Sequence, residues 1–420
     1  MALRKLRSLL NLIVSNKDCL SVAEWLDERR VLRYARFLCG AYALAAILWI
    51  GLSPGLVDPR NRPIGTDFMS FWAAGKLARE SNPADAYDYS RHFAVERQAL
   101  RWHNDYDLMY FPWHYPPTFL LVASLLAIFP YGASLALWTA ISITAYLMAV
   151  RSVLPYRRWL LVALAFPAAF VNLGHGQNGF VSVALLGGGL LLLECNAVVA
   201  GILFGLMSYK PQLGILLPLV LMVSGHWRAF LSAAATTIGL ACVSFFSFGV
   251  ATWRAFIASI SLTRGLMLEQ GAAGWEKLQS VFSAVRTLGG GIEVAYVVQA
   301  IVTFVVAIVA VWMWRKPVSV QSKGAVLTTA SLLATPYVLD YDLILLVLPV
   351  AWLMASAMET GFLEWERIGL FVACFLPFIS RPLGNFHIII TPVVLGFLLL
   401  LIVRRILFSV SSPARKSVRT

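Results

Sequence analysis

The segment around which the chain is organised reads Gly65-Thr66-Asp67-Phe68-Met69-Ser70-Phe71-Trp72-Ala73-Ala74-Gly75. It opens a long polar loop just after the first hydrophobic span. Asp67 is the candidate catalytic residue, because a carboxylate next to a membrane helix lies where water is scarce and can act as a base. The other interpretation is that Asp67 caps the helix that follows, since an N-cap Asp accepts backbone N–H bonds. By spacing alone, capping is the commoner role.

The composition predicts an all-α protein that crosses a membrane many times. Of the 420 residues, 59% are hydrophobic and 13% are charged, and the mean hydropathy is +0.75. Apolar runs recur from about Leu38 to Phe408, and several are long enough to cross a bilayer core. The five cysteines are scattered without metal-ligand spacing, so neither a disulfide framework nor a zinc site is predicted.

The net charge of +13 comes from basic residues in short loops and at the chain ends. This distribution follows the positive-inside rule and marks the cytoplasmic face, so nucleic-acid binding is not predicted. The residues concerned are Arg151, Arg157, Arg158, Arg315, Lys316, Lys323, Arg404, Arg405, Arg415, Lys416 and Arg419.

We expect about twelve transmembrane helices with both termini in the cytoplasm. Residues 1–35 are predicted to form an amphipathic cytoplasmic segment, residues 36–410 the membrane domain, and residues 411–420 a basic cytoplasmic tail. The first outer loop covers 57–116, and a second large outer loop covers 251–292. The apolar piece Thr118 to Phe129 is too short to span comfortably and is predicted to be re-entrant or interfacial. The expected spans are 38–56, 134–150, 159–172, 179–193, 197–209, 211–224, 228–250, 293–314, 324–337, 341–357, 367–380 and 386–408.

Polar residues that follow short apolar spans predict a cavity sunk into the outer leaflet. His175, Gln177 and Asn178 stand among glycines, which is also the composition of an ordinary helix–helix turn. Lys210 interrupts an apolar run, where an ionisable residue is functional by default, although it could instead extend to a nearby interface.

Asp340 and Asp342 flank Tyr341 after Thr335-Pro336. They could bind a divalent metal or sugar hydroxyls, or simply belong to a solvent-exposed loop. Two aspartates do not make a full metal site, so no cofactor is predicted, and a divalent metal remains open.

Several short motifs, in order, resemble those of the multi-pass GT-C glycosyltransferases. The chain closely resembles glycosyltransferase family 87, the polyprenol-phosphate-mannose-dependent α-mannosyltransferases of bacterial membranes. The resemblance covers about residues 38–400. Its motifs are Asp67-Phe68 with Trp72-Ala73-Ala74-Gly75, Tyr115-Pro116-Pro117, Gly176-Gln177-Asn178, Lys210-Pro211, Gln279-Ser280, and Thr335-Pro336 leading to Asp340-Tyr341.

The resemblance implies a polyprenyl-phosphate sugar donor, with mannose as the sugar, and a lipid or glycan acceptor. It also implies a site on the outer face of the inner membrane, with Asp67 as general base. A phosphate leaving group needs no protonation, so one base and one cation, Lys210 or Arg264, could suffice. The other expected substrate-binding residues are Trp72, Tyr115, His175, Gln177, Asn178, Gln279, Asp340, Tyr341 and Asp342.

The sequence departs from the family pattern after the proline of Thr335-Pro336. Where members carry a Ser-Trp pair and paired histidines, this chain has Val338-Leu339 and Tyr341-Asp342. The sugar and the acceptor are therefore left open. A secondary transporter or flippase for a lipid-linked or anionic substrate is the alternative function, because transporters also place ions at broken helices.

Overall fold

The computed structural model describes residue 23 and residues 26–99, 109–154 and 156–411. The prediction of an all-α membrane protein is confirmed, since the regular elements in these ranges are helices. They are α3 (Glu28–Gly51), α4 (Thr66–Glu80), α5 (Tyr89–Ala99), α6 (Pro117–Leu126), α7 (Tyr131–Val153), α8 (Leu160–Ala165), α9 (Pro167–His175), α10 (Gly179–Leu192), α11 (Ala197–Leu206), α12 (Leu217–Val223), α13 (Trp227–Thr263), α14 (Val281–Thr287), α15 (Ile292–Trp314), α16 (Val320–Ala334), α17 (Val347–Thr360), α18 (Glu366–Gly384) and α19 (Thr391–Ser411).

Short turns link these helices. They are the 3-10 turns η1 (Pro54–Leu56), η2 (Pro83–Tyr87), η3 (Arg157–Trp159), η4 (Met207–Tyr209), η5 (Pro211–Gly214) and η7 (Asp340–Leu346), together with the π-helical turn η6 (Arg264–Glu269).

The prediction of twelve transmembrane helices is not confirmed. In the described residues, seven helices are long and apolar enough to cross a membrane, and an eighth span results if the pair bent by 63° at α8 and α9 counts as one. The other predicted spans coincide with shorter helices, among them α10 with 14 residues and α16 with 15. At 1.5 Å per residue, 15 residues cover about 22 Å, which is less than the ~30 Å core of a bilayer.

The first span begins earlier than its predicted start at residue 38. Helix α3 starts at Glu28, because the Asp27 side chain caps it by accepting a hydrogen bond from the Arg30 backbone N–H at 2.8 Å. The predicted boundary between residues 35 and 36 therefore falls inside a helix. Most of the predicted amphipathic segment (residues 1–22, 24 and 25) and residues 412–420 of the tail lie outside the described residues.

The predicted spans 197–209 and 211–224 form one hairpin, with Lys210 at its tip. Pro211 lacks a backbone N–H, and Lys210 has non-helical torsions (φ −131°, ψ 70°), so the helix breaks between them. The far ends of the hairpin lie together, because Ser232, just after the second limb, donates a hydrogen bond to the carbonyl oxygen of Val198 at the start of the first limb at 2.8 Å. The chain therefore enters the protein, turns at Lys210 and returns to the end from which it came.

Helix α13 likewise consists of two helical limbs, which meet at Gly249. Gly249 adopts φ 77° and ψ 168°, which breaks the helix and turns it back toward the site. The second limb packs on α6 and η2, and η6 continues it. The predicted outer loop 251–292 is therefore helical over well more than half its length.

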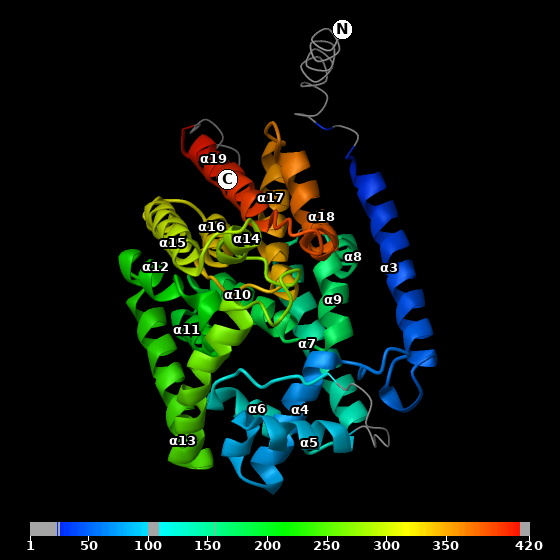
Figure 1. Cartoon of the computed structure of the whole chain (residues 1–420). Coiled ribbons are helices and arrows are strands. Elements are labelled where there is room, and N and C mark those ends of the chain that lie inside the picture. Colours follow the sequence, from blue (N-terminus) through cyan, green and yellow to red (C-terminus); the bar gives the residue numbers. More distant parts are fainter. Residues whose placement is uncertain (1–22, 24–25, 100–108, 155, 412–420) are drawn as a thin grey trace.

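The elements that carry Asp67 gather at one end of the molecule (Figure 1). Helices α4, α5 and α6 form this end, while the start of α3 and the end of α19 lie at the opposite end. Helix α6 has only 10 residues and packs against α4. A Cβ at Gly75 would lie 2.0 Å from the carbonyl oxygen of Ala123, so a glycine is required where these two helices touch.

Candidate active site

Asp67 lies in the first turn of α4 and does not cap that helix. The N-cap is Gly65, in the left-handed conformation (φ 75°), and no side chain caps the helix end. The Oδ2 atom of Asp67 instead accepts a hydrogen bond from Nε2 of Gln177 at 2.8 Å. Its side chain is 27% exposed. The capping interpretation is therefore wrong in this structure, and the carboxylate faces another part of the chain.

Glycine makes this contact possible. Gly176 has a φ of 63°, and a Cβ on it would lie 2.6 Å from the Cβ of Phe68. The backbone that follows α9 therefore packs directly against the Phe68 side chain at the start of α4. This close packing places the His175 and Gln177 side chains beside Asp67.

The orientation of the Gln177 amide is fixed by its neighbours. Its Oε1 accepts hydrogen bonds from the backbone N–H of Asn178 at 3.0 Å and from the hydroxyl of Tyr115 at 3.4 Å. The NH₂ group is therefore the end that meets Asp67. This donor holds the carboxylate in a fixed orientation through its Oδ2 atom.

His175 connects Asp67 to a guanidinium that sequence reasoning missed. Its Nδ1 lies 2.6 Å from Oγ1 of Thr66 and 3.9 Å from Oδ1 of Asp67. Its Nε2 lies 3.5 Å from Nη2 of Arg381, which also pairs with Oδ2 of Asp340 at 2.7 Å. Arg381 stands on α18 between Pro377 and Pro382. Its signal in the sequence, an arginine at the end of an apolar run, is equally typical of a side chain that extends to the membrane interface.

Lys210 and Asp342 form a separate, deeper ion pair. Lys210 Nζ lies 2.8 Å from Oδ1 of Asp342, and the two side chains are 5% and 1% exposed. The ammonium also lies 4.8 Å from the centre of the Tyr341 ring. Asp340 and Asp342 thus each have their own cation. Among the described residues, no group of three or more His, Cys, Asp or Glu side chains is placed to hold a metal ion.

Asn178 and His114 complete the surroundings of Asp67. Asn178 is buried, and neither its Oδ1 nor its Nδ2 has a hydrogen-bond partner. His114, which was not predicted, lies close enough to Asp67 to feel its charge. Burial lowers the pKa of His114 to about 4, and the Asp67 charge opposes part of this shift. His114 is therefore neutral at pH 7, and its Nδ1 lies 3.1 Å from the Thr263 hydroxyl.

Three of the predicted substrate-binding residues make contacts elsewhere. Trp72 donates from Nε1 to the carbonyl oxygen of Phe129 at 2.9 Å and packs in the α4–α6 core. Gln279 accepts from the Thr391 hydroxyl at 2.6 Å and so connects its loop to α19. Arg264 is 65% exposed and pairs with Glu269 at 3.2 Å. The structure therefore gathers Asp67, Tyr115, His175, Gln177 and Asn178, with Lys210 and residues 340–342 in adjoining contacts.

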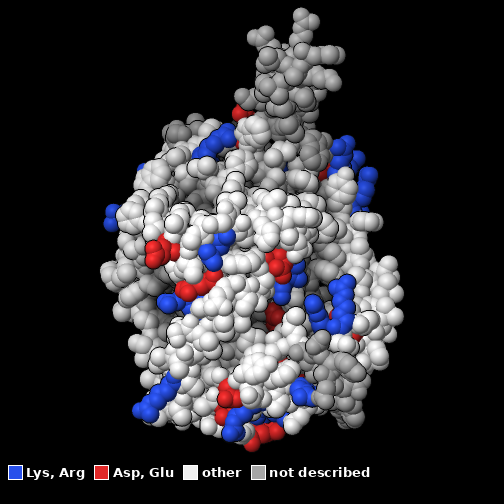
Figure 2. Space-filling view, in the orientation of Figure 1, with Lys and Arg blue, Asp and Glu red and all other residues white. Residues whose placement is uncertain are grey.

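The surface near this end of the molecule is hollowed. Figure 2 shows a recess between the upper and lower parts of the face, with acidic and basic side chains around it and an acidic side chain deep inside. The rest of this face is mostly uncharged. A recess of this kind agrees with the cavity that the short spans and polar loops predict.

Comparison with known proteins identifies the family of the chain. A family model described as glycosyltransferase family 87 matches residues 113–336, more than half of the chain. The match includes His175, Gln177 and Lys210, while Asp67 and Arg381 lie outside it on either side. No curated protein and no solved structure matches the chain. The chain belongs to glycosyltransferase family 87, a GT-C-type family, and is a membrane glycosyltransferase.

Proposed function

We propose that the enzyme transfers a sugar, mannose, from a polyprenyl-phosphate donor to a hydroxyl of a lipid or glycan acceptor. The reaction takes place on the outer face of the bacterial inner membrane. The observation that carries this proposal is the meeting of a part-exposed carboxylate and a part-exposed guanidinium at one histidine, His175. A transfer from a phosphate needs one proton acceptor and one cation, and both types of group are present.

In the proposed step, the acceptor oxygen attacks the anomeric carbon of the donor sugar. The bond from that carbon to the phosphate oxygen breaks, and the phosphate leaves with the electron pair. Asp67 takes the proton of the acceptor hydroxyl. A single displacement inverts the anomeric centre. The Gln177 amide holds the carboxylate by its Oδ2, so one oxygen stays available to the acceptor.

Arg381 is the best-placed cation for the donor phosphate. Its side chain is 35% exposed, and its planar fork can bind two phosphate oxygens while Asp340 holds it in place. Lys210, one of the two cations suggested by the sequence, is only 5% exposed in its pair with Asp342, so a donor phosphate has far less access to it than to Arg381. Arg264, the other, has Glu269 as its partner and lies mostly in solvent.

The experiment is turnover of the purified protein in nanodiscs, with polyprenyl-phosphate mannose compared against a nucleoside-diphosphate mannose. We expect transfer from the polyprenyl phosphate alone. Arg381→Gln should raise the KM for the donor about 10- to 150-fold, which corresponds to a lost charge-assisted contact of about 1.5–3 kcal/mol. Arg264→Gln is the matched control and should leave the KM unchanged. Transfer from the nucleotide sugar, or equal effects of the two variants, would contradict the proposal.

A further inference from the structure

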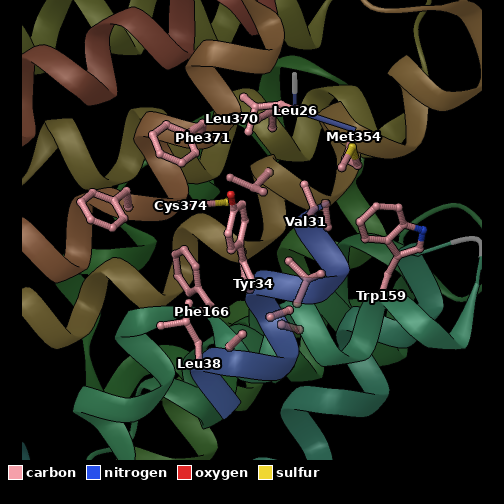
Figure 3. A pocket seen from close by; sticks show the side chains of 18 of the residues that line it. Leu26, Val31, Tyr34, Leu38, Trp159, Phe166, Met354, Leu370, Phe371 and Cys374 are labelled. Carbon is pink, nitrogen blue, oxygen red and sulfur yellow. The ribbon is translucent and has the colours of Figure 1, made fainter. Parts of the chain in front are cut away.

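A second cavity lies away from Asp67, toward the end of the molecule where α3 begins. It has a volume of about 210 Å³ and is bounded by α3, α8, α17 and α18. In Figure 3, Tyr34 extends from α3 into this cavity beside Cys374 of α18, and Trp159 lies at its edge. Its lining is apolar except for a few groups such as Arg367. We refer to it as the α3 groove.

The wall formed by α3 is loosely attached to the bundle. Only 11% of its most apolar window is buried, against 61% for the span Asp340–Thr360. Its main contacts are with α8, and it stands apart from the other helices in Figure 1. Because α3 is a membrane span, the α3 groove opens toward hydrocarbon. An apolar cavity does not hold water, so hydrocarbon is its natural filling.

The groove is nearly as deep as the hydrocarbon half of the bilayer that one leaflet provides. Along α18 it is lined from Arg367 to Phe375, a distance of about 12 Å at 1.5 Å per residue. Half of a hydrocarbon core is about 15 Å. One acyl chain of a lipid from the same leaflet therefore matches this depth.

Polar groups at the mouth suit an anionic headgroup. Arg367 lines the groove, and Arg157 and Arg158 precede Trp159 in η3. Of these three arginines, Arg158 pairs with Glu28 at 2.8 Å. The Trp159 indole is buried, and its N–H has no hydrogen-bond partner. An indole N–H and basic side chains at a membrane boundary are the groups that contact phosphate and ester oxygens.

We propose that the α3 groove binds one acyl chain of an anionic phospholipid from the cytoplasmic leaflet, with its phosphate at Arg367 and Trp159. The bound lipid fills the space between α3 and the bundle and holds α3 in place. The site is separate from the proposed catalytic site and does not depend on the identity of the sugar donor.

The test is native mass spectrometry of the purified protein after delipidation and reloading with phosphatidylglycerol or phosphatidylcholine. The wild type should keep a phosphatidylglycerol adduct in preference to phosphatidylcholine. Leu38→Trp, which fills the groove from α3, should lose the adduct. Leu44→Trp makes the same change on the same helix at an exposed position outside the lining and should keep it. Arg367→Gln should reduce the preference for the anionic lipid about fivefold, since one basic contact is lost.

Three results would overturn the proposal. The first is an adduct equally abundant in Leu38→Trp and Leu44→Trp with both variants folded, as judged by their thermal unfolding curves. The second is a wild type that binds the two phospholipids equally or not at all. The third is displacement of phosphatidylglycerol by polyprenyl phosphate at equal concentration, which would assign the groove to the donor tail instead.

Discussion

Lys210 shows how a residue singled out by the sequence can have a different role in the folded protein. The sequence predicts a functional lysine inside the membrane, and the structure places it in a buried pair with Asp342. Removing one partner of a buried pair leaves an uncompensated charge, which costs about 3–5 kcal/mol. Lys210→Met should therefore lower the thermal unfolding temperature markedly, and adding Asp342→Asn should restore much of it.

The control for Lys210→Met is Lys76→Met. Lys76 pairs with Glu80 at 3.0 Å on the surface of α4, where such a pair contributes only about 0.3–0.5 kcal/mol. If Lys210→Met unfolds normally and only weakens donor binding, Lys210 is a phosphate ligand, as the sequence suggests, and the structural role is wrong.

Glu96 and His92 form a buried pair on α5, with His92 Nδ1 3.5 Å from Glu96 Oε1. Burial raises the pKa of Glu96 to about 9 and lowers that of His92 to about 4, so both are neutral at pH 7. The pKa of Glu96 is about 4.5 in the unfolded chain and about 9 in the folded protein. The contribution of Glu96 to stability is therefore fully present below pH 4.5 and is lost as the pH rises toward 9.

Glu96→Gln removes this titration while keeping a neutral side chain of the same shape. Between pH 6 and 9 the wild type should lose stability by up to about 1.4 kcal/mol per pH unit more than Glu96→Gln. The measurement is thermal unfolding at several pH values. Parallel curves for the two proteins would show that Glu96 is ionised in the folded state.

At the scale of elements, the position of Asp67 depends on how closely α4 packs against α6. Gly75→Ala would place a Cβ 2.0 Å from the Ala123 carbonyl oxygen, so the helices must separate at a cost of about 1–3 kcal/mol. We expect lower stability and lower sugar transfer together. Gly40→Ala on α3 meets no atom within 4 Å and should change neither. Normal activity of Gly75→Ala would show that the α4–α6 contact does not position the site.

The sequence predicts the long elements better than the broken ones. Helices α7, α15 and α19 coincide with uninterrupted apolar runs, which hydropathy detects directly. The Lys210 hairpin and the two limbs of α13 also consist of apolar helices, and composition alone does not show which way each limb runs. Only tertiary contacts determine those directions. The positive φ of Gly249, for example, is required by the packing of the second limb on α6 and η2.

The residues of the candidate site could likewise be predicted only in part from the sequence. Gly176-Gln177 and Asp67 could be singled out because polar residues and glycines follow apolar spans within a few positions. Arg381 could not, because an arginine at the end of an apolar run is equally typical of a side chain that extends to the interface. Its role depends on α18 lying beside α9, which no local pattern encodes. The capping interpretation of Asp67 failed because Gly65 occupies the N-cap.

The proposed reaction on the outer face requires the α4–α6 end of the molecule to face outward and the other end to face the cytoplasm. In a background with the five native cysteines replaced by alanine, Ser90→Cys on α5 should react with an impermeant maleimide in intact cells. Glu359→Cys, near the end of α17, should react only after permeabilisation. Both positions are exposed in the structure. The reverse pattern would put the proposed site on the cytoplasmic side.

The most direct test of the proposed mechanism is the turnover of Asp67→Asn with polyprenyl-phosphate sugar. Asparagine keeps the shape and can still accept the hydrogen bond from Gln177, but it cannot take a proton. We expect transfer to fall roughly 10²–10⁴-fold, the usual effect of losing a positioned base, with an unchanged unfolding curve. Asp58→Asn, in the same loop, should remain active. Transfer by folded Asp67→Asn at more than about a tenth of the normal rate, well above what loss of a base allows, would contradict the role of Asp67.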